Sequence, residues 1–362
     1  MAILDIAHQR LLNQHIALAP FKQPSDVVNW LVAVQSQDYA GAKWALGLRL
    51  QNAHDTDIDR AFREGTILRT HVLRPTWHFV TPADIRWLLA LTAPHVHAVN
   101  AHRYRELELD SATLKRGHEA LVKALQGGKH LTREELSNAL EKAGVAPAQG
   151  QRLAYIVMHA ELDGLICSGP RRGKQFTYAL LDERVPPGKT LKRDEALAEF
   201  ARRYFTSHGP ATVQDFAKWS GLTSADAKRG LEAVKDQLQH EVLNSNEYWL
   251  SPTLSPVKVV SPTAYLLSVY DEYITGYKDR SMIGKPEVAA KLFTMGNALT
   301  AIVVVDGQIV GTWRRTLRKD AVVIETTFFA RLTKTENRAV TAAAQRYGEF
   351  LDLPVMLTQI SS

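Results

Sequence analysis

The sequence of 362 residues contains one cysteine, Cys167, which excludes an internal disulfide and a zinc site built from cysteines. No apolar run approaches the roughly 18 residues needed to cross a bilayer. The first residues, MAILDIAHQRLLNQHIAL, are interrupted by charged and polar side chains and lack the apolar segment of a signal peptide. We therefore expect a cytoplasmic protein with no membrane partner.

Several catalytic and cofactor-binding motifs are also missing. The sequence has no Walker-type glycine loop, no dinucleotide fingerprint, no H-E-x-x-H and no G-x-S-x-G. The segment APHVHAVNAH looks similar to a metal site, but on a helix His95 and His102 share a face while His97 points elsewhere. We predict exposed or hydrogen-bonded histidines here, and we expect neither a metal nor a nucleotide cofactor.

The chain is basic, with 44 Lys and Arg against 38 Asp and Glu, which gives a net charge of +6. Such an excess favours polyanionic partners such as nucleic acid. Charge alone is equally consistent with a basic enzyme whose charge keeps it soluble. The hydrophobic content of 45% and the charged content of 23% are typical of globular proteins, and the length suits two or three domains.

One pattern of short helices followed by a β-hairpin occurs three times along the chain. In the middle copy, Thr132 and Glu135 have capping-box spacing before a first helix, and a second helix covers roughly residues 149–163. The segment LICSGPRRGKQFTYALL then reads as a hairpin. In the third copy, Thr212 and Asp215 begin a helix, and a later hairpin turns near residues 244–246. The first copy ends in ILRTHVLRPTWHFV, where a proline at position 75 limits strand pairing.

Helix, turn, helix and hairpin is the plan of a winged helix, in which the second helix suits the DNA major groove. The same plan also occurs in small packing units and in modules that contact other proteins. After Pro252 the sequence becomes rich in β-branched residues, with predicted strands in residues 256–262, 300–317 and 321–329 and a helix from Thr333. A turn at Asp306-Gly307 joins two of these strands.

These patterns predict an α+β fold of three tandem winged-helix modules followed by a small antiparallel β-barrel with a C-terminal helix. The predicted boundaries are residues 1–110 for the first module with a helical extension, 111–184 for the second, 190–252 for the third and 256–362 for the barrel. Because the chain has no heptad repeat and carries its modules in tandem, we expect a monomer without an obligate protein partner.

Two basic clusters lie in predicted hairpins and are candidate DNA-binding residues. The first contains Arg171, Arg172 and Lys174, and the second contains Arg314, Arg315, Arg318 and Lys319. Cations at hairpin tips suit phosphate contacts, which position a protein on the duplex without reading its sequence. A solvated turn explains either cluster equally well when it is taken alone.

The segment LLSVYDEYITGYKDRS contains the densest group of polar residues, with Asp271, Glu272, Asp279 and Arg280 among tyrosines. Charges among apolar residues are usually paired. We predict a structural ion pair between Asp271 and Arg280, against the alternative of a direct role at DNA.

The segment WLVAVQSQDYAGAKW places two amides close together, at Gln35 and Gln37, with Ser36 between them. Residues two apart face the same side of an extended segment and different sides of a helix. If the chain unwinds here, both amides point at one place. The alternative is that they satisfy the carbonyl groups at the end of the preceding helix.

The segment YDEYITGYKDRS followed by VVVDGQIVGTWRRTLR resembles the C-terminal signature of a bacterial family of winged-helix DNA-binding domain-containing proteins. The similarity extends to LRPTWHFVTPADIRWL, LTREELSNAL and GLICSGPRRGKQFTYALLDERVP, and so covers essentially the whole chain. The studied members of this superfamily are the AlkZ- and YcaQ-like DNA glycosylases, which excise alkylated purines and unhook interstrand crosslinks. The resemblance implies three winged helices with a β-barrel, and a structural motif at Asp271, Tyr273 and Arg280.

The catalytic motif of that family is glutamine, an aliphatic residue, and then glutamine or aspartate. The resemblance therefore implies that Gln35 and Gln37 are catalytic, although Ser36 departs from the aliphatic pattern. The implied function is a monofunctional glycosylase that removes cationic N7- or N3-alkylated purines from damaged double-stranded DNA, in a nucleoid-associated protein. The alternatives are a non-catalytic winged-helix protein or transcription regulator, and a set of protein-interaction modules.

Overall fold

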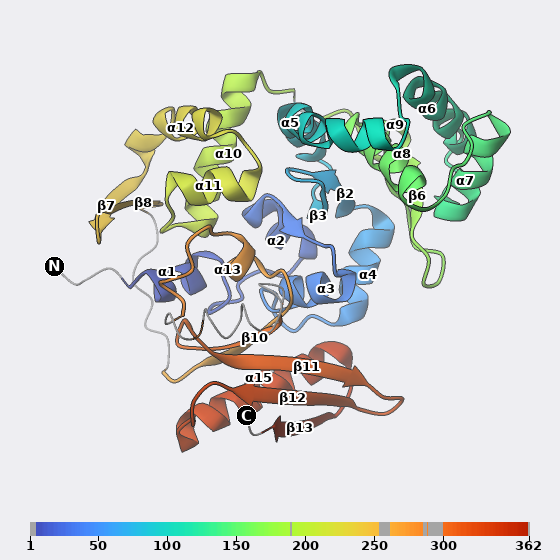
Figure 1. Cartoon of the computed structure of the whole chain (residues 1–362). Helices are drawn as coiled ribbons and strands as arrows, with labels where there is room; N and C mark the ends of the chain where they lie inside the picture. Colours follow the sequence, from blue (N-terminus) through green and yellow to red (C-terminus); the bar gives the residue numbers. More distant parts are fainter. Residues whose placement is uncertain (1–4, 189, 253–260, 285–287, 289–299, 361–362) are drawn as a thin grey trace.

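The computed structural model describes residues 5–188, 190–252, 261–284, 288 and 300–360. Figure 1 shows a central unit near the N-terminus, with two helical units on one side of it and a β-sheet on the other. None of the described helices is long and apolar enough to cross a membrane. The predicted strand in residues 256–262 lies mainly outside the described residues.

The central unit contains short helices and a small antiparallel sheet, and it ends in a long helix. Its elements are α1 (Ile6–Asn13), α2 (Pro24–Leu31), β1 (Val34–Gln35), α3 (Tyr39–Gly47), α4 (Asp55–Glu64), β2 (Leu68–Val72), β3 (Thr76–Val80) and α5 (Ile85–Glu106). The strands lie in the order β1-β3-β2. Pro75 falls in the turn, so β2 and β3 pair along their whole length, from Leu68 with Val80 to Val72 with Thr76. Pro75 thus limits their pairing only at the turn end.

The second unit has its own apolar core and follows the predicted order of helices and hairpin. Its elements are α6 (Ser111–Leu125), β4 (Leu131–Thr132), α7 (Arg133–Lys142), α8 (Gly150–Leu162), β5 (Ile166–Ser168), β6 (Thr177–Leu180) and α9 (Leu181–Arg184). The predicted capping box is present, because the side chains of Thr132 and Glu135 each bond to the backbone N–H of the other.

The third unit packs its helices against α5 and the central hairpin in a shared core. Its elements are α10 (Arg193–His208), α11 (Val213–Ser220), α12 (Ser224–Glu232), the 3-10 helix η1 (Lys235–Gln237), β7 (Gln239–Leu243) and β8 (Asn246–Leu250). The helix predicted to begin at Thr212 and Asp215 does so with a capping box formed by these two residues, and the hairpin turns at Asn244-Ser245 as expected.

The C-terminal part forms a mixed sheet with the strand order β13-β12-β11-β10-β9. Its elements are β9 (Ala264–Leu267), α13 (Glu272–Thr275), β10 (Ile302–Val305), β11 (Gln308–Leu317), β12 (Val322–Phe328), α15 (Lys334–Leu351) and β13 (Val355–Ile360). Asp306 and Gly307, both with positive φ, make the predicted two-residue turn between β10 and β11.

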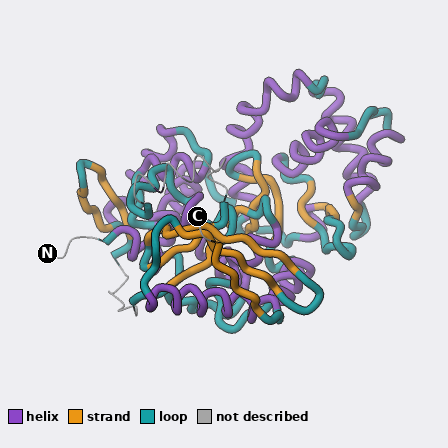
Figure 2. Tube along the Cα trace, turned by 60° about the horizontal axis from the view of Figure 1, so that its bottom comes forward, coloured by secondary structure: helices purple, strands orange, loops and turns teal. Residues whose placement is uncertain are grey.

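The prediction of a small antiparallel barrel was wrong. Within the described residues the sheet is open, and its strands lie side by side without closing (Figure 2). The strand β13 pairs with β12 in the parallel direction, because helix α15 connects them as a crossover rather than a tight turn. Trp44 of α3 joins this sheet to the central unit, since its indole donates to the carbonyl of Leu266 and its ring meets Tyr347.

Candidate functional site

The chain unwinds at the segment Gln35-Ser36-Gln37, with Gln35 in the short strand β1 and Gln37 in the bend that follows it. Helix α2 ends before Val32, which has a φ of +68°, and the chain then runs as β1 along β3. Gln35 lies opposite His78 in this pairing, and the amide of Ser36 donates to the carbonyl of Trp77 at 2.8 Å. The segment is therefore fixed to the sheet by its backbone, which leaves the glutamine side chains available for other contacts.

The side chain of Gln35 faces the turn between β2 and β3. Its Oε1 lies 3.5 Å from a guanidinium nitrogen of Arg74, a long contact that leaves most of the bonding capacity of the amide unused. Gln35 is buried and Gln37 is exposed. The Gln35 amide thus meets an arginine and not the carbonyl groups of the preceding helix, which was the alternative interpretation.

The third unit braces the turn that carries Arg74. Gly221, the left-handed residue between α11 and α12, lies so close to this turn that a Cβ atom there would be 2.2 Å from the carbonyl oxygen of Leu73. Only glycine permits this approach, both for its space and for its φ of +72°. The position of Arg74 therefore depends on contact between the central and third units.

A buried carboxylate, Glu272, holds the backbone of Gln35. Its Oε1 accepts from the backbone N–H of Gln35 at 2.9 Å. Its Oε2 accepts from the indole of Trp219 at 2.7 Å and lies 3.5 Å from Nε2 of His208. Burial favours the neutral carboxyl group, but its bonds to His208 and to the Gln35 amide outweigh this and lower the pKa of Glu272. Glu272 is only 1% exposed, so it positions the segment and does not reach solvent.

His78, which pairs with Gln35, is a buried and neutral imidazole. Burial lowers its pKa to about 3, and the nearby charge of Arg74 adds to this effect. Because the side chain contacts the carbonyl of Thr76 through Nδ1 at 3.0 Å, Nδ1 carries the proton. Its Nε2 has no hydrogen-bond partner among the described residues. Beside Gln35, Nε2 of His78 is therefore an acceptor without a formal charge and without a partner among the described residues.

Ser36 is fully buried, and its hydroxyl has no hydrogen-bond partner among the described residues. Its carbonyl accepts from Nε of Arg69 at 3.1 Å. The guanidinium of Arg69 lies between the rings of Trp77 and Phe176, at 4.2 and 4.6 Å from their centroids. Burial lowers the pKa of Arg69 to about 10, so it remains charged at neutral pH. The middle residue of the motif thus occupies an interior position that suits an aliphatic side chain.

The predicted ion pair between Asp271 and Arg280 is not formed. Asp271 pairs instead with Arg49 of the central unit, through two bonds of 2.9 and 3.0 Å, and both side chains are fully buried. Arg280 donates to the carbonyl of Ile274 at 3.1 Å. Asp271 also caps α13 by accepting from the amide of Tyr273, so it faces inward while Arg280 lies on the outer side of the turn.

In the hairpin between β5 and β6, only part of the predicted basic cluster is open to a partner. Arg172 is exposed but forms an ion pair with Glu135 at 2.9 Å. Arg171 is partly buried and lies 3.7 Å from Asp59. Lys174 is exposed, with no ion pair among the described residues. The positive charge available at this hairpin is therefore smaller than the sequence indicated.

The second basic cluster is divided between a strand and a turn. Arg314 on β11 is paired with Glu325 on β12 at 2.7 Å, and Arg315 is partly buried against the hydroxyl and ring of Tyr347. Arg318 lies in the exposed turn between the two strands. Neighbouring residues on a strand face opposite sides, which is why Arg314 and Arg315 do not act together.

Three residues that line or support the glutamine segment were not predicted from the sequence: Arg74, His78 and Glu272. The first two lie in the stretch LRPTWHFV, where only strand pairing drew attention. Glu272 was one of several charges in its segment, and only its distance from Gln35 in space distinguishes it. Long-range contacts of this kind leave no periodic pattern in a sequence.

The comparisons agree with this architecture. The chain is 26% identical over 315 residues to an interstrand DNA cross-link repair glycosylase of Streptomyces sahachiroi, an alignment that covers 82% of this chain and 84% of the relative. The solved structure of the DNA glycosylase AlkZ from the same organism superposes with a TM-score of 0.80 over 98% of both chains, at 22% identity. The model of the AlkZ-like DNA glycosylase family matches residues 28–350. The chain belongs to the AlkZ-like DNA glycosylase family.

Proposed function

We propose that this protein hydrolyses the N-glycosidic bond of cationic N7- or N3-alkylated purines in double-stranded DNA and that it unhooks interstrand crosslinks made of such lesions. The single observation that carries this proposal is the Gln35-Ser36-Gln37 segment beyond the end of α2, held through its backbone by Glu272 and β3. The named relatives act on DNA as glycosylases by their descriptions. The family membership makes the same chemistry the first expectation here.

The chemistry requires little acid catalysis. An N7-alkylated purine carries a positive charge, so the base leaves without being protonated by the protein. The sugar then resembles an oxocarbenium ion, as in glycoside hydrolysis. The remaining tasks are to place a water molecule against C1′ and to stabilise the cationic sugar. Each glutamine amide offers one acceptor and two donors, so Gln35 and Gln37 together orient water by proximity and not by strong basicity.

The surroundings of Gln35 fit this role. The partly exposed guanidinium of Arg74 lies next to its amide oxygen and is suited to a flanking DNA phosphate. His78 contributes no positive charge near the reacting sugar, because it stays neutral. We assign Glu272 as a positioning residue, whose buried negative charge also favours a cation in this region.

We infer that the three helix-helix-hairpin units are winged helices that bind DNA as one monomer. The exposed turn between β11 and β12 adds a second contact, since Leu317 at the end of β11 is 59% exposed and precedes Arg318 and Lys319 of the turn. Apolar side chains flanked by cations are the groups that proteins insert between base steps in the minor groove. Lys174 supplies a phosphate contact at the hairpin of the second unit. On this proposal the protein works on chromosomal DNA in the cytoplasm.

A non-catalytic DNA-binding protein is the second candidate, and the buried polar hydroxyl of Ser36 is the observation that favours it. An unpaired hydroxyl at the centre of the motif loosens the packing that an aliphatic residue would give. DNA binding without base excision is what this candidate predicts.

The decisive experiment is single-turnover excision from duplex DNA containing one N7-methylguanine, with abasic sites revealed by alkaline cleavage. We expect Gln35→Ala and Gln37→Ala to lower the rate by about 10² to 10³ while DNA affinity is kept. The matched control is Gln126→Ala, an exposed glutamine at the end of α6. A parallel duplex with an uncharged lesion, such as hypoxanthine, should remain uncut. Equal rates for wild type and both glutamine variants, or no excision of any cationic lesion, would leave the DNA-binding candidate.

A further inference from the structure

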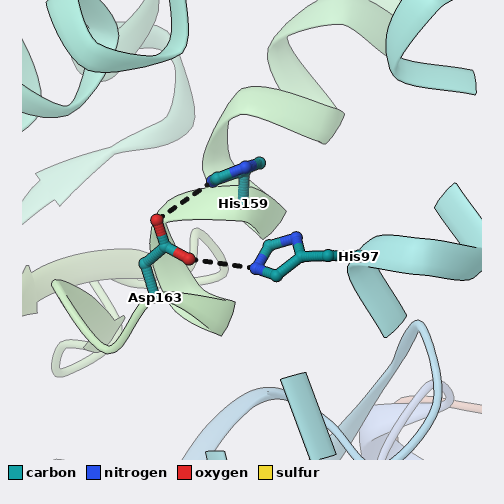
Figure 3. Close-up of side chains that lie close together, drawn as sticks. All are labelled: His97, His159 and Asp163. Atoms are coloured by element: carbon teal, nitrogen blue, oxygen red, sulfur yellow. Dashed lines mark hydrogen bonds and ion pairs between the residues drawn. The ribbon is translucent and has the colours of Figure 1, made fainter. Parts of the chain in front are cut away.

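Three histidines and one aspartate meet where the long helix α5 contacts the second unit. His97 comes from α5, His118 from α6 and His159 from α8, and Asp163 follows directly after α8. Figure 3 shows His97 and His159 pointing at Asp163 from two different helices. None of these residues takes part in the site around Gln35, so the cluster needs an explanation of its own.

The sequence alone pointed away from this place. On α5, His95 and His102 share a face and were the natural pair, but both are exposed. His97 faces the second unit, where it lies close to His159 and Asp163, which are 62 and 66 residues further along the chain. The expectation that no metal binds this segment therefore rested on one helix, whereas the ligands come from several.

The ligand atoms of His97, His159 and Asp163 all lie within 4.8 Å of one another, and His118 reaches the same carboxylate. Nε2 of His97 is 3.0 Å from one carboxylate oxygen of Asp163, and Nδ1 of His159 and of His118 lie 3.3 and 3.7 Å from the other. Ligands bonded to zinc at 2.0–2.1 Å in tetrahedral geometry are separated by about 3.3 Å. His97, His159 and Asp163 are thus close enough to share one divalent ion, and His118 would complete the set by moving toward them.

The contacts of the two imidazoles also suit metal ligands. Nδ1 of His159 is buried and lies 3.3 Å from the carboxylate of Asp163 (Figure 3), an ion-pair contact that does not have the geometry of a hydrogen bond. The ring of His97 is oriented through its other nitrogen, Nδ1, which lies 3.0 Å from the hydroxyl of Tyr104. A second partner of this kind is typical of histidines that bind metals, because it fixes both the tautomer and the ring direction.

A solvent path to the cluster exists. A cleft of about 530 Å³ is lined by His118, His159 and Asp163 together with Lys115 and Glu119. Imidazole and carboxylate are ligands that zinc accepts, and three histidines with one aspartate complete a four-coordinate site. When all four coordination positions are filled by protein ligands, none is left for a reacting water, so the ion would be structural.

We propose that His97, His118, His159 and Asp163 bind one zinc ion, which fastens α5 to helices α6 and α8. The ion links the helix that leaves the central unit to the second unit, and so fixes the orientation of one DNA-binding unit relative to the rest. This site is independent of the proposed chemistry at Gln35.

The test uses the full chain without an affinity tag, stripped of metal with a chelator. Zinc is titrated by calorimetry, and cobalt is titrated while its visible absorption is recorded, because tetrahedral cobalt gives intense bands. We expect one ion per chain, strong cobalt bands and a higher thermal midpoint with zinc. His159→Ala and Asp163→Asn should weaken binding at least 100-fold and abolish the thermal shift.

The matched control is His102→Ala, on the same helix, where an exposed histidine lies 3.6 Å from Glu106 and offers an alternative surface site. This variant should bind zinc like the wild type. If His159→Ala does not fold without metal, His118→Asn makes the same comparison. Absence of saturable binding by the wild type, or binding that survives loss of His159 and falls with loss of His102, would overturn the proposal.

Discussion

The buried pair of Arg49 and Asp271 gives a sharp test of how the site is supported. The guanidinium of Arg49 donates five hydrogen bonds, two of them to Asp271 and the others to Gln14 and to the carbonyl of Ala45. Both charged side chains are 0% exposed. The residue after Asp271 is Glu272, which holds the backbone of Gln35, so the pair also supports the glutamine segment.

Replacing Arg49 with methionine keeps much of the side-chain volume but leaves the carboxylate of Asp271 buried without its counter-ion. Breaking a buried pair in this way costs about 3–5 kcal/mol of unfolding free energy. Arg280→Met is the matched control, because Arg280 makes only a bond to the carbonyl of Ile274. Losing one such bond from a charged donor costs about 1.5–3 kcal/mol, so its effect should be clearly smaller.

The measurement is urea denaturation followed by tryptophan fluorescence, with midpoints compared at constant slope. Removing the charge from the partner should restore much of the loss, so the double variant Arg49→Met with Asp271→Asn should be more stable than Arg49→Met alone. Equal losses for Arg49→Met and Arg280→Met would refute the assignment of the pair. If the stability lost in the double variant equals the sum of the losses in Arg49→Met and Asp271→Asn, the electrostatic explanation of the pair is refuted.

Three further predictions concern the site and its surroundings. Ser36→Ala should raise the free energy of unfolding by about 1 kcal/mol in the same urea assay without lowering the excision rate, because it removes a buried hydroxyl that has no partner. His78 has a pKa of about 3 when folded, below the value of about 6.5 expected when unfolded, so the unfolded chain binds one more proton between these values. Its contribution to stability is therefore complete above pH 6.5 and is lost as the pH falls toward 3, by about 1.4 kcal/mol per pH unit, and His78→Gln should flatten this slope in denaturation at several pH values. Lys174→Ala should lower the salt dependence of DNA affinity by about one unit, whereas Arg172→Ala should change it less, because Glu135 already neutralises that arginine; equal slopes for the two variants in fluorescence anisotropy titrations would contradict this.

The features that the sequence predicted correctly are local ones. The helices predicted to begin at Thr132, Thr212 and Thr333 do so, each with a capping box whose side-chain and backbone groups are only three residues apart. The turn at Asp306-Gly307 is equally local, since two residues with positive φ define it. These signals determine where elements begin and turn.

The features that the sequence did not predict depend on distant pairings. The open sheet replaces the expected barrel because α15 returns the chain so that β13 pairs parallel to β12. Asp271 was assigned to Arg280, nine residues away, whereas its partner Arg49 is 222 residues away. Nearness along the chain is a poor guide for a buried charge, because any arginine that reaches the same interior can neutralise it.

The candidate site combines features that the local sequence predicts with features that depend on distant contacts. The chain unwinds after α2, which is the condition that the spacing of the amides raised, but only Gln35 lies on a strand, and Gln37 lies in the bend that follows. The sequence could not show that Glu272 and Arg74 meet this strand, because they are brought there by α13 and by a turn that Gly221 allows to approach.

The environment of Gln35 also explains why the proposed chemistry depends on a charged lesion. The carboxylate of Glu272 accepts from the backbone N–H of Gln35 and from the indole of Trp219, and it is buried away from a water at the sugar. The nearby imidazole of His78 is too weak a base to take a proton, since its pKa is about 3. Around Gln35 the described residues therefore provide orientation and not strong acid or base catalysis. A bond that breaks under these conditions must already be weakened in the substrate, and a positive charge on the purine provides that weakening.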